Sequence, residues 1–291
     1  MEFVVTGGAG FIGSRLAKAL LKKGGVTIVD DLSTGFKENA PEGAELVEAT
    51  ILDYAKLEEA VSTADAVFHL GGVVGVPGSV KHPEHCFRVN VTGTANVLEA
   101  AKEHGSQVVY ASSAAVYGEK PSVPSKESDG LAPASPYAES KLKAERLVVE
   151  AGGTALRLFN VFGPGQRITS GYAAVVPAFI QAAKKGEPLR LDGGGSQTRD
   201  FVFVEDVVNA FVKARGTAGV YNVGSGKAVS IRELAQKIVS LTGSDSNIVE
   251  APGREGDVRD SLADVSAARK AFGFEPRYSL EQGLKVVVEN E

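Results

Sequence analysis

Short apolar runs alternate with amphipathic stretches through the first half of the chain. The runs are dense in Val, Ile, Leu and Phe and predict strands, at 2–7, 26–31, 44–49, 66–72 and 107–113. The stretches between them carry apolar residues at helical spacing and predict helices, at 11–22, 54–62 and 84–104. Continuous apolar strands that alternate with helices are typical of a buried parallel sheet.

The second half is less regular. Segment 119–136 is rich in Pro and Ser and is expected to be a surface loop. A strand returns near residue 158, and further elements are expected at 172–185, 205–214, 220–224, 230–242 and the C-terminus. We therefore expect an α/β fold, with a Rossmann-type doubly wound parallel sheet and helices on both faces over residues 1–165. A smaller α/β domain with some interleaved segments is expected over residues 166–291.

Composition and charge narrow the class of protein. The 291 residues carry a formal net charge of −5 and no run of Lys or Arg, so nothing favours a nucleic-acid partner. No apolar stretch has the length of a bilayer span, and the acidic start of the chain is unlike a signal peptide. The single cysteine fits a reducing compartment. We expect a cytoplasmic protein without a membrane partner.

A glycine-rich turn joins the first predicted strand to the first predicted helix. In VVTGGAGFIG, Gly7, Gly10 and Gly13 let backbone N–H groups at a helix N-terminus approach a pyrophosphate. The second strand ends at Asp30, where an acid would bind the adenine ribose hydroxyls. A carboxylate there repels the extra phosphate of NADP, so NAD is the expected cofactor. Arg15, in the first turn of the helix, keeps NADP as the alternative.

A tyrosine and a lysine lie four residues apart in SPYAESK. On a helix that begins at Pro136, the side chains of Tyr137 and Lys141 project from one face. A phenol with a pKa of about 10 is a poor base at neutral pH, and a nearby ammonium group lowers that pKa. Ser112 and Ser113 end a predicted buried strand, where ligands meet parallel sheets. The pattern therefore favours proton transfer at a substrate oxygen.

The order of these motifs resembles the extended branch of the short-chain dehydrogenase/reductase superfamily. The spacings Gly-x-x-Gly-x-x-Gly and Tyr-x-x-x-Lys carry the resemblance, together with VDDLSTG, HLGG, NVTGTANVLEAA, ASSAAVYG, RLFNVFGPGQ, TRDFVFVEDV and YNVGSG. Within that branch the chain looks most like nucleotide-sugar epimerases of the UDP-glucose/UDP-galactose 4-epimerase type. The resemblance assigns catalysis to Ser113, Tyr137 and Lys141, and it implies that Lys141 also bonds the nicotinamide ribose.

The resemblance also implies which residues surround NAD. Ser112 is expected to face the cofactor. Thr50 stands where the family usually has an adenine-contacting acid, so NAD affinity is expected to fall without being lost. The whole implied set is Gly7, Gly10, Phe11, Ile12, Gly13, Asp30, Asp31, Ser33, Thr34, Gly35, Thr50, Ile51, Leu70, Gly71, Gly72, Val74, Asn90, Ala111, Ser112, Tyr137, Lys141, Phe159 and Val161.

Two arginines match positions where the family contacts a nucleotide diphosphate, namely Arg199 and Arg254. Asp257 would bind a ribose hydroxyl or orient Arg254, and Asn160 would reach the phosphate-sugar region. Ser261 aligns with a bulky aromatic of the family, and the smaller side chain leaves room for an N-acetyl group at C2 of the sugar. The implied substrate site, for a UDP-hexose, is completed by Ser113, Tyr137, Val175 and Val176.

The residues at 113–115 differ between members of the family that catalyse different reactions. Related dehydratases carry an acidic pair there and decarboxylases a Thr-Ser-Glu variant, whereas this chain has Ser113, Ala114 and Ala115. The resemblance therefore implies a 4-epimerase of UDP-glucose and UDP-galactose that acts through a 4-keto sugar. A hydride would leave C4, the sugar would rotate, and the hydride would return to its other face. NAD would be regenerated in each turnover and held as a prosthetic group.

No metal is expected. His82, His85 and Cys86 lie close together in KHPEHC, but Pro83 indicates a loop and a helix entry, and a fourth ligand for a closed site is missing. His69, in FHLGG, is instead expected at a strand end beside the cofactor.

Several alternatives stay open. The chain could be an NAD-dependent dehydrogenase or reductase of a sugar nucleotide, or an epimerase of UDP-glucuronate or dTDP-sugars. A non-catalytic NAD-binding protein is disfavoured because the three catalytic residues are intact. For Arg199 the alternative is a surface ion pair with Asp200 or Glu205. Helices 84–104 and 139–150 resemble those that form a four-helix bundle between subunits in this superfamily, which implies a homodimer.

Overall fold

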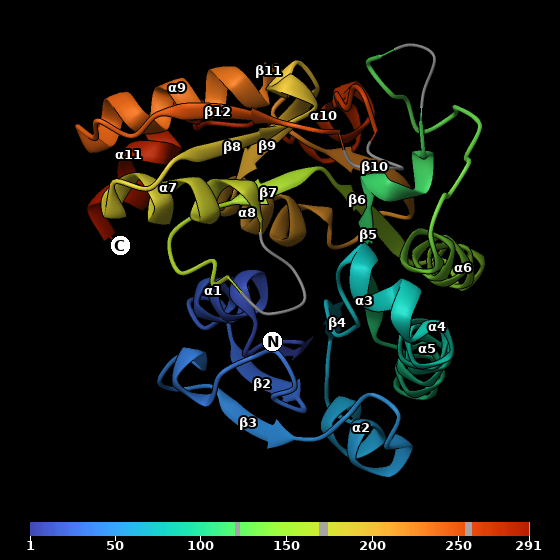
Figure 1. The fold of residues 1–291 in the computed structure, drawn as a ribbon. Coiled ribbons are helices and arrows are strands. Elements are labelled where there is room, and N and C mark those ends of the chain that lie inside the picture. The colour runs from blue at the N-terminus through green and yellow to red at the C-terminus, as the bar shows by residue number, and fades with distance from the viewer. Residues whose placement is uncertain (120–122, 169–173, 254–257, 291) are drawn as a thin grey trace.

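A seven-stranded parallel sheet forms the centre of the molecule (Figure 1). The computed structural model describes residues 1–119, 123–168, 174–253 and 258–290. The strand order is β10-β6-β5-β4-β1-β2-β3, so the winding reverses between β1 and β4. The strands are β1 (Glu2–Thr6), β2 (Gly25–Asp30), β3 (Glu45–Glu48), β4 (Ala66–His69), β5 (Gln107–Ser113), β6 (Thr154–Leu158) and β10 (Gly219–Val223).

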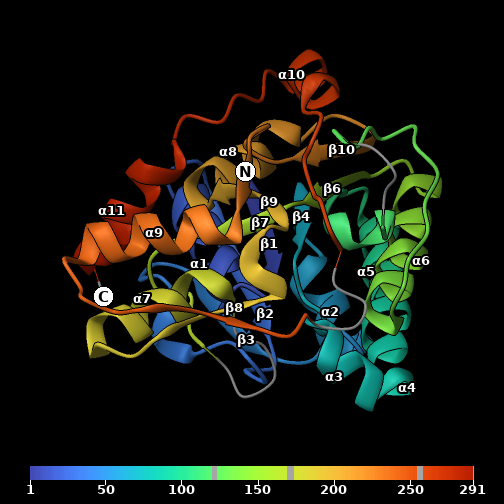
Figure 2. The same cartoon turned by 45° about the horizontal axis from the view of Figure 1, so that its top comes forward.

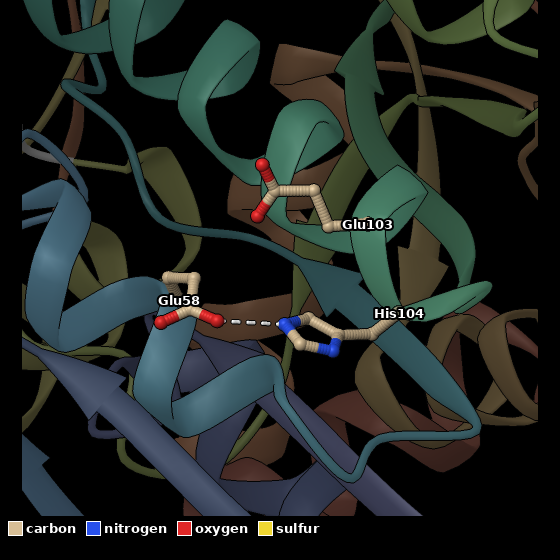
Figure 3. Close-up of side chains that lie close together, drawn as sticks. All are labelled: Glu58, Glu103 and His104. Atoms are coloured by element: carbon tan, nitrogen blue, oxygen red, sulfur yellow. Dashed lines mark hydrogen bonds and ion pairs between the residues drawn. The ribbon is translucent and has the colours of Figure 1, made fainter.

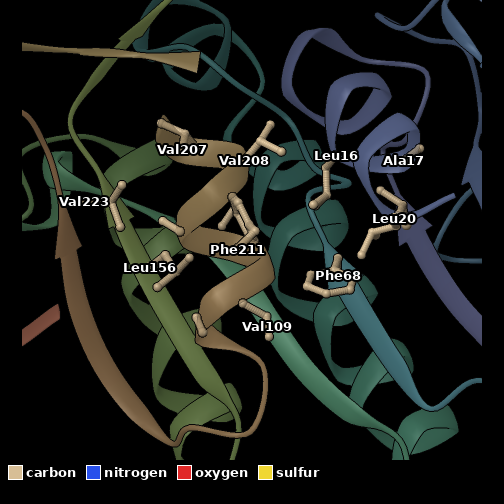
Figure 4. Packing of buried hydrophobic residues seen from close by; sticks show 14 of the residues in the cluster. Leu16, Ala17, Leu20, Phe68, Val109, Leu156, Val207, Val208, Phe211 and Val223 are labelled. Carbon is tan, nitrogen blue, oxygen red and sulfur yellow. The ribbon is translucent and has the colours of Figure 1, made fainter. Parts of the chain in front are cut away.

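Helices cover both faces of this sheet, which is the predicted doubly wound arrangement (Figures 1 and 2). On one face, Leu16 and Phe211 pack over Phe68 and Leu156 of the strands (Figure 4). These residues bring together α1 (Phe11–Leu20) and α8 (Val204–Ala214), which are remote in sequence. The other face is covered by α2 (Tyr54–Val61), α5 (Gly93–His104) and α6 (Pro136–Glu150).

A second, smaller core lies beyond the carboxyl ends of the large sheet. It is built on two small sheets, β11-β9-β7 and β12-β8, and on three helices that pack against them. The strands are β7 (Asn160–Phe162), β8 (Leu189–Asp192), β9 (Thr198–Phe203), β11 (Ala228–Ser230) and β12 (Ile248–Ala251). The helices are α7 (Val175–Lys185), α9 (Ile231–Thr242) and α11 (Leu280–Asn290), and α10 (Ser266–Phe272) packs against β10 and α8.

The two halves of the chain are interleaved. Strand β10 and helix α8 follow residue 165 in sequence, yet β10 is an edge strand of the large sheet and α8 covers it. The strand expected near residue 158 divides at Phe159, because β6 pairs within the large sheet whereas β7 pairs with β9. The chain thus crosses from one core to the other at this residue.

The helix expected at 84–104 is interrupted. After α3 (Val76–Lys81), the chain forms α4 (Pro83–Phe87), a π-helical turn (Arg88–Thr92) and then α5 over this range. Single π-helical turns are rare and frequently lie at functional sites. Among the residues that the structure describes, no helix has both the length and the apolar character of a membrane span.

Candidate functional site

The turns that follow β1 and β4 lie against each other at the point where the winding of the sheet reverses. A Cβ atom on Gly7, whose φ is +70°, would lie 2.7 Å from the backbone nitrogen of Gly71. A Cβ atom on Gly13 would lie 2.1 Å from the carbonyl oxygen of Gly7. Helix α1 follows Gly10 without a side-chain cap, so its first N–H groups are not satisfied by that residue. This cradle fits a dinucleotide pyrophosphate.

Asp30 fixes the glycine turn from the end of β2. Its carboxylate accepts hydrogen bonds from the N–H groups of Ala9 and Leu32, both at 2.9 Å. A Cβ atom on Gly35 would lie 2.9 Å from Asp30 Oδ1, so the following loop passes close to the carboxylate. Burial raises the pKa of Asp30, and the two N–H donors oppose that shift. The remaining lone pairs suit the hydroxyls of a ribose.

The other residues predicted on the adenine side lie in loops after β2 and β3. Asp31 Oδ1 accepts the N–H of Ser33 at 3.0 Å and its hydroxyl at 2.5 Å, which closes a tight turn before Thr34. Thr50 Oγ1 accepts the N–H of Leu52 at 3.3 Å. Ile51 is buried, so its side chain belongs to the core beside these loops.

Arg15 is engaged away from the glycine turn. Its guanidinium donates to the carbonyl oxygens of Phe11 and Pro164 and lies 3.9 Å from the carboxylate of Glu205. These contacts tie α1 to α8 and to the loop after β7. They give the Arg15 guanidinium partners within the protein.

Helix α6 holds Tyr137 by its backbone. The helix begins at Pro136, as predicted, and Ser135 caps it by accepting the N–H of Ala138 at 3.2 Å. The N–H of Tyr137 donates to Ser79 Oγ at 3.1 Å, and the hydroxyl of Ser140 donates to the carbonyl of Tyr137 at 2.8 Å. Two serines therefore fix the first turn of this helix.

Lys141 is buried one turn farther along α6, with 4% of its surface exposed. Its ammonium group donates to the carbonyl of Ala111 at 2.9 Å and lies 4.8 Å from the ring centroid of Tyr110. Burial lowers the pKa of Lys141 to about 8, against a smaller opposing effect of Cys86. A Cβ atom on Gly72 would lie 3.8 Å from the lysine nitrogen. The predicted lysine thus joins the end of β5 to the turn after β4.

The two serines that end β5 face different environments. Ser113 is half-buried and its Oγ accepts the N–H of Ala115 at 3.2 Å, which leaves the hydroxyl proton for another acceptor. Ser112 is buried and donates to Glu145 Oε2 at 2.6 Å. The Ser112 side chain therefore points to Glu145 on α6, and the side chain of Ser113 points to the other face of the strand. A contact of Ser112 with the cofactor stays a prediction.

Asn90, predicted to bind the cofactor, links two walls of the site. Its Oδ1 accepts the N–H of Val73 at 2.8 Å, and its Nδ2 donates to Ser140 Oγ at 2.9 Å. Only 2% of its surface is exposed, and a Cβ atom on Gly72 would lie 2.8 Å from its Oδ1. The turn after β4 is therefore connected to the serine that holds Tyr137.

Two of the predicted substrate residues are brought together at the start of β9. Arg199 Nη1 donates to the carbonyl oxygens of Thr198 at 2.8 Å and Arg259 at 3.3 Å. The N–H of Ser261 donates to the same Thr198 carbonyl at 3.1 Å. Asp200, an alternative partner for Arg199, is buried and accepts backbone N–H groups, those of Ser225, Gly226 and Ala263.

The remaining predicted substrate residues are spread along the second half. Asn160 begins β7 and is half-buried, whereas Val176 is buried in the smaller core. Phe159 and Val161 likewise pack into hydrophobic clusters. Arg254 and Asp257 lie outside the described residues.

The possible metal ligands that gather in the described part of the chain are not those of KHPEHC. Glu58, Glu103 and His104 have ligand atoms within 4.8 Å of one another (Figure 3). His104 Nε2 lies 2.8 Å from Glu58 Oε1, and the hydroxyl of Tyr54 donates to Glu103 at 3.0 Å. These residues lie on α2 and at the end of α5, near the start of β5, whereas Lys141 lies near the end of that strand.

Sequence reasoning missed a buried ion pair behind the site. Arg157 Nη2 lies 2.7 Å from Glu145 Oε1, its Nε lies 3.0 Å from Oε2, and both side chains are under 5% exposed. Arg157 also donates to the hydroxyl of Tyr117 at 2.9 Å, which donates to Asn222 at 2.7 Å. A signal was present, since Glu145 falls on the buried stripe of α6 one turn after Lys141.

Comparison with known proteins places these features in context. The model of the NAD dependent epimerase/dehydratase family matches residues 3–224. The UDP-glucose 4-epimerase of Mycolicibacterium smegmatis is 39% identical, over 99% of this chain and 98% of the relative. The UDP-N-acetyl-alpha-D-glucosaminuronate decarboxylase of Bacillus cytotoxicus is 36% identical, over 98% and 96%.

Solved structures agree with the fold throughout its length. A UDP-glucose 4-epimerase of Thermotoga maritima with UDP-glucose has a TM-score of 0.96 and 36% identity, over 100% of this chain and 98% of that one. A UDP-N-acetylglucosamine 4-epimerase of Methanobrevibacter ruminantium has a TM-score of 0.95 and 37% identity, over 99% and 97%. A UDP-glucose 4-epimerase of Thermus thermophilus, solved with NAD, has a TM-score of 0.92 and 33% identity, over 100% and 98%.

Proposed function

This chain belongs to the NAD dependent epimerase/dehydratase family, and we propose that it is a nucleotide-sugar 4-epimerase that interconverts UDP-glucose and UDP-galactose. One observation carries the proposal. The buried ammonium of Lys141 lies at the end of β5, one turn from Tyr137, and the two residues after Ser113 are alanines, without a carboxylate for elimination. Proton transfer at one sugar oxygen is the chemistry that this set supports.

In this proposal the protein residues manage one proton. The glycine turn and Asp30 would hold NAD, which would supply a hydride acceptor and donor for C4 of the sugar. Tyr137 accepts the proton of the C4 hydroxyl as the carbonyl forms and gives it back on reduction. Lys141 stabilises the phenolate by its positive charge, and Ser113 donates a hydrogen bond to the C4 oxygen. A proton passed in both directions leaves these residues unchanged after each turnover.

The nucleotide is assigned to the wall formed by β9 and residues 258–264. Arg199 suits the diphosphate because a guanidinium can bond two phosphate oxygens at once. Ser261 lies beside it through the shared Thr198 carbonyl, and its small side chain leaves room near the sugar. We infer that the enzyme also accepts UDP-GlcNAc and UDP-GalNAc, a substrate class that fits the similarity to a UDP-N-acetylglucosamine 4-epimerase.

The test is incubation of the purified protein, without added cofactor, with UDP-glucose, UDP-galactose, UDP-GlcNAc, UDP-glucuronate and dTDP-glucose. Inversion at C4 would be read by NMR, and the expected result is inversion of the UDP-hexoses. The similarity to decarboxylases, among them two UDP-glucuronic acid decarboxylases that are 32% identical to this chain, makes carbon dioxide release from UDP-glucuronate the main competing outcome. A requirement for added NAD, with release of NADH, would identify a dehydrogenase instead.

We also infer that the protein is a cytoplasmic homodimer. Helices α4 and α5 both pack against α6, so α5 and α6 lie side by side, and a second copy can meet them across a two-fold axis. The single cysteine fits a reducing compartment. Light scattering at micromolar concentration should give twice the monomer mass of 30.3 kDa, and a mass equal to the monomer would contradict the dimer.

A further inference from the structure

A chain of buried hydrogen bonds crosses the core beside the glycine turn. The N–H of Gly71 donates to Thr6 Oγ1 at 3.1 Å, and Thr6 Oγ1 lies 2.7 Å from His69 Nδ1. On the other side of the imidazole, Nε2 lies 2.9 Å from Thr94 Oγ1, which donates to the carbonyl of Asn90 at 2.6 Å. Thr6, His69 and Thr94 have no exposed surface.

The two ends of this chain set its direction. The carbonyl of Asn90 can only accept, so it takes the single hydroxyl proton of Thr94, and Thr94 must accept from His69 Nε2–H. The N–H of Gly71 can only donate, so Thr6 accepts it and gives its own proton to His69 Nδ1. Every group is satisfied by a neutral imidazole with its proton on Nε2. An imidazolium would leave the hydroxyl proton of Thr6 without its acceptor.

The surroundings of the ring favour the same state. Burial lowers the pKa of His69 to about 3, and the positive charge of Lys141 on α6 acts in the same direction. On β5, the ring of Tyr110 lies 5.2 Å from the imidazole, centroid to centroid. Burial raises the pKa of Tyr110, so this neighbour stays neutral as well.

The two ends of this hydrogen-bond chain, Gly71 and Asn90, lie in different walls of the site. Gly71 touches the glycine turn, since a Cβ atom on Gly7 would lie 2.7 Å from its nitrogen. Asn90 lies in the π-helical turn, and its side chain bonds Ser140, which holds the carbonyl of Tyr137. We propose that His69 is a positioning residue, a permanently neutral bridge that sets the glycine turn and the Tyr137 helix at their working separation. The part of this inference that concerns turnover rests on the proposed epimerase activity.

Two conservative variants divide the bridge into its halves. In His69→Asn the amide oxygen stands near the place of Nδ1 and keeps an acceptor for Thr6. In His69→Gln the amide nitrogen stands near the place of Nε2 and keeps a donor for Thr94. His69→Leu removes both ends and is the reference variant.

The experiment measures the NAD dissociation constant and kcat for UDP-galactose in all three variants. We expect His69→Leu to weaken NAD binding and lower kcat by about tenfold each, the order expected when buried polar groups lose their partners. His69→Asn should restore most of the NAD affinity, and His69→Gln most of kcat. Folded His69→Leu with wild-type NAD affinity and kcat would overturn the proposal, as would identical behaviour of the Asn and Gln variants.

Nitrogen NMR of the ¹⁵N-histidine-labelled wild-type protein tests the bridge without any substrate. The resonance that disappears in His69→Gln should show a protonated Nε2 and an unprotonated Nδ1, unchanged between about pH 5 and 9, the range in which a free imidazole titrates. Titration in that range, or a proton on Nδ1, would refute the assignment. This readout and NAD affinity are independent of the sugar, so absence of epimerisation would count against the proposed function alone.

Discussion

Lys141 and Ala111 are joined by a hydrogen bond of 2.9 Å between a buried ammonium group and a carbonyl at the end of β5. The bond places the positive charge of the lysine beside the strand that ends in Ser113. The ammonium group is buried there, and burial lowers the pKa of Lys141 to about 8. In the site without ligand, the surroundings of Lys141 thus disfavour its charged form. Titratable groups with such shifted pKa values are common at functional sites.

The first prediction concerns stability in the absence of NAD. Between pH 8 and the pKa of a free lysine, the folded protein has lost the Lys141 proton and the unfolded chain has kept it. The free energy of unfolding should therefore rise with pH in this window, by about 1.4 kcal/mol per pH unit at most. In Lys141→Met this contribution is absent. Urea unfolding of both proteins should show that the free energy of unfolding of Lys141→Met minus that of the wild type falls between pH 7 and 9.5. A constant difference would contradict the shifted pKa of Lys141.

The second prediction concerns Tyr137. Its backbone is fixed by Ser79 and Ser140, so Tyr137→Phe removes a hydroxyl without disturbing the helix. Turnover should fall by at least about 100-fold, the usual contribution of a positioned acid or base. NAD binding should stay within about threefold, as measured by fluorescence titration. Substantial activity in this variant would exclude Tyr137 as the group that carries the proton.

The third prediction compares two glycines. A Cβ atom on Gly13 would lie 2.1 Å from the Gly7 carbonyl oxygen, whereas one on Gly78 would meet nothing within 4 Å. Gly13→Ala should therefore abolish NAD binding, because the turn must open to admit the methyl group. Gly78→Ala, in α3, should bind NAD as the wild type does. If calorimetry finds equal NAD affinity in both variants, the turn does not form the cradle.

The fourth prediction concerns the buried pair behind the site. Arg157→Met leaves the Glu145 carboxylate buried without its cation, and the free energy of unfolding should fall by about 3–5 kcal/mol. The double variant Glu145→Leu with Arg157→Met removes both charges and should recover part of that loss. Denaturant unfolding at pH 7 measures both effects. A double variant less stable than the single one would contradict this prediction, because removal of an unpaired buried charge would then have lowered stability.

The fifth prediction tests the small side chain at the nucleotide wall. Ser261→Tyr should lower kcat/KM for UDP-GlcNAc by at least about tenfold, since in the proposed function the ring would fill the space near C2 of the sugar. The value for UDP-glucose should change much less, and Ser261→Ala should resemble the wild type on both sugars. A Tyr variant with an unchanged ratio of the two values would rule out Ser261 as the residue that sets this tolerance.

Several features of the site could be predicted because each depends on a short stretch of chain. Gly7 and Gly13 lie in one turn whose geometry excludes side chains, and that requirement is visible in their spacing. Tyr137 and Lys141 share a helix face by their separation alone. The continuous apolar runs predicted a parallel sheet, because the strands of such a sheet are buried on both faces.

That same burial hid other features. A strand that is buried on both faces shows no alternation of apolar and polar residues. The sequence therefore did not reveal that Ser112 points to Glu145 and Ser113 to the opposite face. The interruption of the helix at Asn90 was also hidden, because that residue is held by Val73 and Ser140 from other segments.

The sequence by itself determined the glycine turn, the acid at the end of β2 and the Tyr-Lys helix, because each is specified by neighbouring residues. The tertiary structure decided which segments meet: β10 beside β6, Ser261 beside Arg199, and His69 between Thr6 and Thr94. Such meetings join residues far apart in the chain, and their hydrogen bonds form only when packing has already excluded water. The local pattern of apolar and polar residues does not indicate which distant segments pack together, so these contacts are seen only in the folded protein.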